Sequence, residues 1–324
     1  MWLITGATGF IGSALVWELN ENGMDDIVVC DFVRPEERPG ILRKRRYKEF
    51  VHAGELMAWL DRPDNASRLK GVYHMGACST TTETDADYLR RNNTEYTRDL
   101  FNYCARQNIP FIYASSGACY GDGQLGFDDA RNPADYKPLN LYGWSKLNFD
   151  IWAVQQKQTP PHWYGLRFFN VYGPNEYHKG EMSSVAFKAF HQIREKHQVR
   201  LFRSYNPQYK DGEQLRDFVY VKDVVRWMRE LMQRKPSPSG IYNMGFGKAR
   251  SWLALAGSLF KGLHQPEKIE WIDVPANIRN QYQYFTEAKM DRFEKLGVSK
   301  VQWPLERGVQ DYVENYLLKE DPFL

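Results

Sequence analysis

Short apolar runs alternate with amphipathic segments along the first half of the chain. Four runs are continuous in apolar residues, as strands buried on both faces of a parallel sheet are, and they lie at residues 1–5, 26–31, 71–77 and 109–116. Between them, residues 12–23 and 92–108 have the spacing of amphipathic helices. Because strands and helices alternate with short connections, the pattern predicts an α/β fold with a doubly wound parallel sheet.

The second half continues this pattern only in part. A helix is predicted over residues 143–156 and a strand over residues 164–173. Beyond residue 174 the sequence becomes polar and turn-rich, with isolated strands at 199–202 and 217–221. We therefore expect two unequal units that interleave: a sheet domain over residues 1–171, to which residues 215–247 return, and a smaller lobe made mainly of residues 172–324.

Composition and charge exclude several classes of protein. The net charge of the 324 residues is only +3, which does not indicate a nucleic-acid-binding surface, and the one basic cluster, residues 42–48, is interpreted as a solvated face. No apolar run approaches the roughly 20 residues that a membrane span needs, and the N-terminus lacks the features of a signal peptide. We expect a cytoplasmic protein with reduced thiols and no metal site, because no CxxC pair or nearby histidine accompanies Cys30, Cys78, Cys104 or Cys119.

A glycine-rich stretch, TGATGFIGS, joins the first strand to the first helix. Its glycines, Gly6, Gly9 and Gly12, let the backbone turn tightly and approach a pyrophosphate at the helix N-terminus. The spacing is GxxGxxG and therefore differs from the GxGxxG form. Its position between strand and helix nevertheless predicts a dinucleotide site.

The end of the second strand bears on the choice of dinucleotide. Asp31 lies nineteen residues after Gly12, where an acid accepts the ribose 2′-hydroxyl of NAD. Arg34 and Arg38 follow at once, and guanidinium groups suit the 2′-phosphate of NADP. On these residues alone, both cofactors remain open.

The stretch LYGWSK places Tyr142 and Lys146 four residues apart, on one face of the predicted helix. The strand at 109–116 ends at Ser116, at the edge where open α/β sheets bind ligands. A phenol has a pKa of about 10, so a pKa near 7 requires about 4 kcal/mol of stabilisation of the phenolate. A neighbouring ammonium, together with an oxidised nicotinamide, favours the phenolate. We therefore interpret Tyr142 as a redox base, with Ser116 bound to the same substrate oxygen.

The stretches TGATGFIG, ASSGACYG and YGWSK resemble the extended short-chain dehydrogenase/reductase family of NAD-dependent epimerases and dehydratases. Five further stretches are most similar to members that epimerise C6″ of an ADP-heptose: MGACSTTTE, RFFNVYGPNEYHKGEMSSVAF, LRDFVYVKDV, YNMGFGKARS and NQYQYFTEAKM. This resemblance spans nearly the whole chain. It implies a Rossmann domain, a substrate-binding second lobe, and conversion of ADP-D-glycero-D-manno-heptose to its L-glycero epimer by transient oxidation with NADP, for lipopolysaccharide core synthesis. It also implies a homo-oligomer, expected to be a pentamer.

The resemblance also implies roles for individual residues. Tyr142 and Lys179 are the two acid/base groups, Lys146 lowers the pKa of Tyr142 and holds the nicotinamide ribose, and Ser116 binds the reacting oxygen. The cofactor positions are Gly6, Gly9, Phe10, Ile11, Gly12, Asp31, Phe32, Arg38, Met75, Gly76, Ala77, Cys78, Ser79, Asn92, Lys146 and Val171. The substrate positions are Ser116, Asn170, Glu181, Lys188, Phe202, Arg203, Ser204, Tyr205, Arg216 and Tyr282. Four of these depart from the usual family residues: Phe32, Arg38, Glu181 and Lys188.

Two alternative functions remain open from the sequence. A UDP-hexose 4-epimerase has the same tyrosine and lysine but does not usually carry the HKG motif that contains Lys179. A non-enzymatic dinucleotide- or RNA-binding member is favoured only by the basic residues 42–48. A 4,6-dehydratase is disfavoured, because Gly117 and Ala118 stand where that class needs an Asp–Glu pair.

Overall fold

The computed structural model describes residues 1–234, 237–275, 279 and 282–324. Within these residues, seven strands form a central sheet in the order β11-β6-β5-β4-β1-β2-β3, and every pairing is parallel. The strands are β1 (Trp2–Thr5), β2 (Ile27–Asp31), β3 (Glu49–His52), β4 (Gly71–His74), β5 (Phe111–Ser116), β6 (Trp163–Phe168) and β11 (Gly240–Met244). The predicted doubly wound parallel sheet is confirmed.

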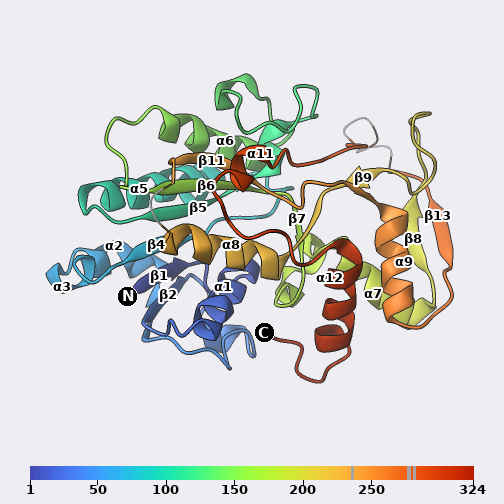
Figure 1. Cartoon of the computed structure of the whole chain (residues 1–324), viewed down its shortest axis with the longest axis horizontal. Helices are drawn as coiled ribbons and strands as arrows, with labels where there is room; N and C mark the ends of the chain where they lie inside the picture. The colour runs from blue at the N-terminus through green and yellow to red at the C-terminus, as the bar shows by residue number, and fades with distance from the viewer. Residues whose placement is uncertain (235–236, 276–278, 280–281) are drawn as a thin grey trace.

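Helices cover both faces of this sheet (Figure 1). The segments of this part of the chain are α1 (Phe10–Glu21), α2 (Leu56–Leu60), α3 (Pro63–Ala66), α4 (Ala86–Leu89), a π-helical stretch (Arg90–Glu95), α5 (Tyr96–Arg106), α6 (Leu141–Val154) and α8 (Val221–Gln233). Successive strand residues point to opposite faces, so Ile4 packs in the core beneath α1 and α8, whereas Leu3 packs beneath α5 and α6. The sheet is thus buried on both sides.

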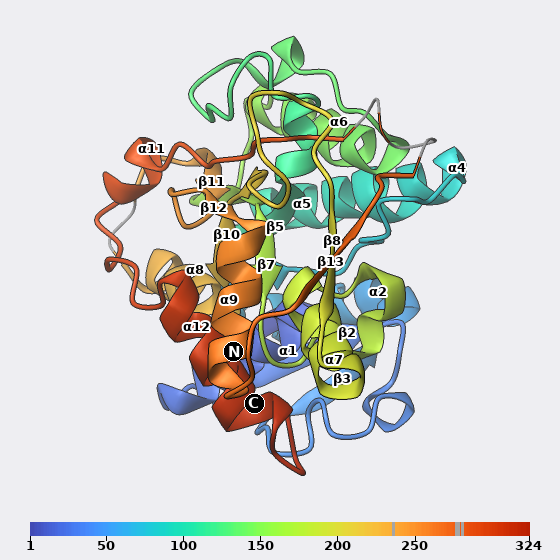
Figure 2. The ribbon, with the colours of Figure 1, turned by 90° about the vertical axis from the view of Figure 1, so that its right-hand side faces the viewer.

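A second group of elements lies beyond the end of the sheet at which the strands finish, on the right of Figure 1 and toward the viewer in Figure 2. Its strands form three pairs: β7 (Asn170–Tyr172) with β10 (Phe218–Tyr220), β8 (Val199–Phe202) with β13 (Ile269–Ile272), and β9 (Leu215–Arg216) with β12 (Arg250–Ser251). Its helices are α7 (Val185–Lys196), α9 (Trp252–Gly262), α12 (Leu305–Tyr312) and a π-helical turn (Val313–Leu317), whereas the short helix α11 (Asp291–Glu294) packs beside β11 of the central sheet. Where one domain ends and the other begins stays a prediction.

One prediction about the second half was wrong, and another was incomplete. The strand expected over 164–173 is broken at Phe169, because the chain leaves the central sheet there and Asn170–Tyr172 pairs with β10. Beyond residue 174 the expected turn-rich sequence and the two expected strands, β8 and β10, are found, but the sequence analysis did not predict the helices α7, α8, α9 and α12. The helix α7 buries one narrow face, made of Ala186, Ala189, Phe190 and Ile193, and the polar residues on its other faces obscure this spacing in the sequence.

In the part of the chain that is described, no helix is long and apolar enough to cross a membrane. Asn280 and Gln281, the first residues of the stretch NQYQYFTEAKM, lie outside that part.

Candidate active site

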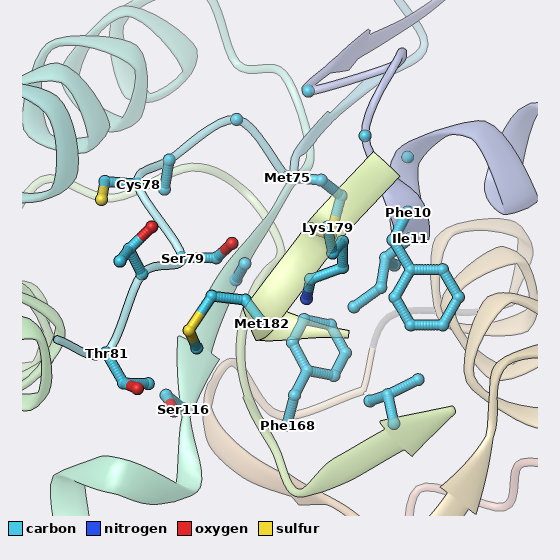
Figure 3. A pocket seen from close by; sticks show the side chains of 18 of the residues that line it. Phe10, Ile11, Met75, Cys78, Ser79, Thr81, Ser116, Phe168, Lys179 and Met182 are labelled. Carbon is cyan, nitrogen blue, oxygen red and sulfur yellow. The ribbon is translucent and has the colours of Figure 1, made fainter. Parts of the chain in front are cut away.

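A pocket of about 690 Å³ opens at the carboxyl ends of β1, β4 and β5. The chain leaves β1 and β4, which are neighbours, toward opposite faces of the sheet, and ligands of doubly wound folds bind at such a point. All residues predicted to bind the cofactor line this pocket, and so do Ser116, Tyr142, Asn170 and Lys179. In Figure 3, Cys78, Ser79 and Thr81 lie on one side of the view, Phe10 and Ile11 lie on the other, and Lys179 lies between them.

The glycine loop fits a dinucleotide pyrophosphate. Gly6 has a φ of +66°, and a Cβ at this position would lie 2.6 Å from the backbone nitrogen of Gly76. A Cβ at Gly12 would lie 2.0 Å from the carbonyl oxygen of Gly6. The loop is therefore as close to the neighbouring strand and helix as bare backbone allows, and α1 directs its free N–H groups toward the pocket.

Asp31 and Arg38 fix the opposite end of the cofactor groove. The Asp31 carboxylate accepts hydrogen bonds from the backbone nitrogens of Thr8 (3.0 Å), Phe32 (2.8 Å) and Val33 (3.3 Å). The Arg38 guanidinium donates to the carbonyl oxygen of Thr8 at 2.8 Å and lines the pocket. The Asp31 carboxylate is thus hydrogen-bonded to backbone groups, and the Arg38 guanidinium lies at the rim of the pocket.

Tyr142 lies in the first turn of α6, which begins at the N-cap Asn140, whose side chain accepts a hydrogen bond from Gly143. Tyr142 and Ser116, at the end of β5, both line the pocket. Burial raises the pKa of the Tyr142 phenol to about 12, and the nearby Ser116 hydroxyl only partly opposes this rise. Lys146 is not among the groups that shift this pKa, so the expected lowering by Lys146 is not found in the protein without its cofactor.

Burial also affects Lys146, one helical turn further along α6. The side chain is buried, and dehydration lowers the pKa of its ammonium from 10.5 to about 8. The site thus holds a cation without a carboxylate in direct contact among the described residues. Such an arrangement suits contact with hydroxyl groups of a bound ribose.

Replacing Lys146 with methionine is expected to raise the free energy of unfolding of the cofactor-free protein at pH 7 by up to about 3 kcal/mol. Below pH 8 the buried Lys146 is charged in the folded protein, so the free energy of burying its ammonium destabilises the fold in full. As the pH rises from about 8 to 10.5, the folded lysine loses its proton first, so this cost disappears. Urea unfolding at pH 7 and pH 10 measures the difference, which must shrink at the higher pH. A less stable variant with no pH dependence would contradict the expectation.

A buried ion pair supports the catalytic helix from behind. Asp150 of α6 accepts hydrogen bonds from Arg167 of β6 and from Tyr113 and Ser115 of β5, each at 2.9 Å. Asp150 and Arg167 are both fully buried. One carboxylate therefore ties α6, which carries Tyr142, to the strand that ends in Ser116.

Changing Asp150 to alanine is expected to cost about 3–5 kcal/mol of stability, because it leaves the Arg167 guanidinium buried without its partner. Denaturant unfolding followed by circular dichroism measures the loss. The double variant Asp150→Leu/Arg167→Met removes both charges and is expected to recover most of it. If the double variant is as unstable as the single one, the charge itself is not the cause.

The π-helical stretch connects the cofactor loop to α6. Asn93 accepts a hydrogen bond from the backbone nitrogen of Cys78 (2.8 Å) and donates to its carbonyl oxygen (3.0 Å). The same side chain donates to the hydroxyl of Ser145 at 2.9 Å. Residues 75–79 are thereby held at a fixed position relative to Tyr142 and Lys146.

Lys179 reaches the pocket from a short 3₁₀ segment, Tyr177–Met182. Its ammonium lies 5.6 Å from the centre of the Phe10 ring. Burial lowers the pKa of Lys179, and the carboxylate of Glu176 opposes this shift. Glu176 is itself buried and accepts hydrogen bonds from Gly173, Ser184 and Tyr312, which fix the start of the segment. The lysine is thus placed where a neutral amine forms more readily than on the surface.

The remaining predicted substrate residues do not line the pocket. Arg216 lies behind it, with its guanidinium 5.5 Å from the Trp252 ring and 5.3 Å from the Tyr282 ring, and Trp252 does line the pocket. Glu181 and Lys188 pair with each other on the surface. The others outside the lining are Phe202, Arg203, Ser204, Tyr205 and Tyr282. Their binding of substrate stays a prediction.

The sequence analysis did not assign several residues that line the pocket, among them Thr81, Phe168, His178, Met182 and Trp252. His178 belongs to the HKG motif, and Phe168 to the stretch that contains Asn170, so both lay beside assigned residues. Met182 likewise lies beside the assigned Glu181, in the segment that carries Lys179. Trp252 carried no local signal and reaches the pocket only through the packing of the second lobe.

The basic residues 42–48 do not line the pocket. Arg45 pairs with Glu21, Arg46 with Asp25, and both Arg43 and Lys44 with Asp321. Their charge is thus largely compensated within the chain.

Among the described residues, no cluster of histidine, cysteine and acidic side chains is arranged to hold a metal ion, and the four cysteines are free.

Comparison with known proteins places this site in a family. The model of the NAD dependent epimerase/dehydratase family matches residues 2–245. The chain belongs to this family. It is 49% identical over 333 residues to the ADP-L-glycero-D-manno-heptose-6-epimerase of Fusobacterium nucleatum, with 100% of both chains covered. It is 48% identical over 325 residues to the enzyme of that name from Nitratidesulfovibrio vulgaris, again with 100% of both covered.

A solved structure extends the comparison to three dimensions. The crystal structure of Helicobacter pylori ADP-L-glycero-D-manno-heptose-6-epimerase matches with a TM-score of 0.76 and 27% identity, covering 97% of this chain and 95% of that one. The resemblance inferred from the sequence motifs is therefore confirmed. As a member of the epimerase family, the chain is an enzyme that uses a nicotinamide dinucleotide, which the glycine loop fits.

Proposed function

We propose that the protein epimerises C6″ of ADP-D-glycero-D-manno-heptose to give the L-glycero epimer. The observation that carries this proposal is the presence of two candidate acid/base groups, Tyr142 and Lys179, on the walls of one pocket. The names of the full-length relatives support the choice of substrate. An inversion needs one group for each orientation of the sugar, and this pocket offers both.

The chemistry divides between the cofactor and the chain. When bound, the dinucleotide supplies the hydride acceptor and donor for C6″. Tyr142 takes the proton of the C6″ hydroxyl in one orientation, and Ser116 donates a hydrogen bond to the same oxygen. After the sugar turns its other face, the ammonium of Lys179 returns a proton to that oxygen. Exchange with water then restores both groups.

The proposed cofactor is NADP. Asp31 is occupied by three backbone N–H groups and offers little acceptor capacity to a ribose 2′-hydroxyl. Arg38 lies at the pocket rim and suits a 2′-phosphate. Mass spectrometry of the nucleotide that co-purifies with the protein tests this choice, and NAD alone would contradict it. A cytoplasmic location and a pentameric assembly stay predictions.

The substrate is tested by incubating the protein with NADP and ADP-D-glycero-D-manno-heptose and following the two epimers by NMR. Both epimers are expected to reach a constant ratio from either starting material. A parallel incubation with UDP-glucose tests the 4-epimerase alternative. Interconversion of UDP-glucose and UDP-galactose, with no change at C6″ of the heptose, would overturn the proposal.

A further inference from the structure

Residues Asp321–Leu324, which we call the tail clamp, contact the segment that follows β2. The Asp321 carboxylate pairs with Arg43 at 2.7 Å and with Lys44 at 3.0 Å. The Lys44 ammonium also donates to the carbonyl oxygen of Phe323 at 2.7 Å. This segment carries Arg38, so the tail clamp is anchored to the wall proposed to hold the cofactor's adenosine.

The other side of the tail clamp contacts the segment that carries Lys179. The Tyr177 hydroxyl donates to the carbonyl oxygen of Pro322 at 2.7 Å. The backbone nitrogen of Leu324 donates to the Asn175 side chain at 3.0 Å, and Asn175 donates in turn to Ser13 of α1, also at 3.0 Å. Residues 175 and 177 are therefore held on both sides of Glu176.

The ring of Phe323 fills the space between these two walls. It meets the ring of Tyr177 edge-on, with centroids 5.3 Å apart. On its other side, a Cβ at Gly40 would lie 2.4 Å from the Phe323 ring, and Gly40 has a φ of +96°. Only glycine fits both the backbone conformation and this contact. Leu324 is buried in the core cluster beneath α1.

We propose that the tail clamp positions Lys179 and couples it to the cofactor-binding wall. Lys179 lies two residues after Tyr177, which contacts the tail clamp. The other contacts that fix this segment are mainly those of Glu176. Loosening the tail clamp therefore displaces Lys179 while leaving Tyr142 on its separately supported helix. The inference rests on the proposed two-group mechanism.

The test compares Phe323→Ala and Asp321→Asn with Glu320→Gln, an exposed charge next to the tail clamp. Single-turnover reduction of the cofactor is followed from each heptose epimer separately, because each epimer presents its hydroxyl to a different group. Phe323→Ala is expected to slow the reaction from one epimer on the order of tenfold to hundredfold, as small misplacements do, and to leave the other within about twofold. The slowed epimer must be the one most affected by Lys179→Met.

A second readout does not depend on turnover. The backbone nitrogens of Lys179 and Ser183 donate to the carbonyl oxygens of Glu176 and Gly180, so their amide hydrogens report on the order of this segment. In Phe323→Ala and Asp321→Asn, hydrogen exchange over residues 177–184 is expected to accelerate at least about tenfold, with α6 unchanged. Glu320→Gln must exchange as the unaltered protein does.

The outcomes separate the two proposals. Equal slowing from both epimers, or unchanged exchange over residues 177–184, would overturn the positioning role. If the unaltered protein does not epimerise the heptose, the proposed function fails, and the exchange measurement still decides whether the tail clamp orders the Lys179 segment. An increase in the Kd for NADP in Asp321→Asn, which Glu320→Gln does not show, supports the coupling to the cofactor wall.

Discussion

Replacing Lys179 with methionine is expected to slow epimerisation on the order of 10²–10⁴-fold, the usual contribution of a general acid or base. Methionine keeps the unbranched stem that lies beside Phe10 but carries no exchangeable proton. The cofactor contacts at the glycine loop and Arg38 are untouched, so the Kd for NADP must stay nearly constant. Epimer ratios by NMR, together with fluorescence titration of the cofactor, measure the two effects.

The variant Lys179→Arg separates acid/base chemistry from charge. Arginine keeps the positive charge and binds phosphates well, but it does not lose its proton in proteins. It must therefore be about as slow as the methionine variant if Lys179 transfers a proton. Near-normal activity of Lys179→Arg would instead make this residue a contact for the substrate diphosphate. Lys196→Met, an exposed change on α7, controls for the loss of a lysine.

The pH dependence of the unaltered enzyme bears on the same residue. Burial lowers the pKa of Lys179, so its neutral form is present at a lower pH than that of an exposed lysine. In the direction in which Lys179 acts as base, the rate must rise with pH through this lowered pKa. In the opposite direction it acts as an acid, so the rate must fall over the same range.

The sequence predicts the parts of this site whose requirements are local. Gly6 and Gly12 are needed because backbone contacts leave no room for a Cβ. A requirement of this kind can be recognised from the glycine itself in the sequence. Tyr142 and Lys146 are related by helical spacing alone. The strands β1, β2, β4 and β5 follow from runs of apolar residues, because strands buried on both faces leave an uninterrupted signal, whereas the edge strand β3 was not predicted.

Tertiary packing determines what the sequence did not reveal. Tyr177 and Pro322, which help to place Lys179, are 145 residues apart in the chain. The basic residues 42–48 look like a solvated cluster until the acidic partners from α1, its following turn and the C-terminal segment are brought beside them. The pKa of Tyr142 likewise depends on how completely the surrounding elements exclude water, which the YxxxK spacing does not contain.

Replacing Tyr142 with phenylalanine is expected to reduce epimerisation by about as much as Lys179→Met, on the order of 10²–10⁴-fold. The ring is kept, and only the hydroxyl is removed, so the free energy of unfolding must change by no more than about 1.5 kcal/mol. Because the protein alone raises the phenol pKa to about 12, formation of a phenolate near pH 7 requires about 7 kcal/mol of stabilisation. Because Lys146 is already present in the protein that gives this value, the positive charge of the bound oxidised cofactor must supply it. Ultraviolet difference titration is therefore expected to show a tyrosinate signal at lower pH with NADP than without it, which Tyr142→Phe abolishes.

The double variant Tyr142→Phe/Lys179→Met decides whether the two groups act within one turnover. Each inversion uses one group to remove a proton and the other to return it, so either single change interrupts every turnover in both directions. The double variant is then expected to be scarcely slower than the slower single variant, as for residues that act as a unit. If the two losses multiply, the groups contribute independently, and one of them acts on binding rather than on proton transfer. Oxidation from the separate epimers distinguishes the two residues, because Tyr142→Phe must slow one epimer and Lys179→Met the other.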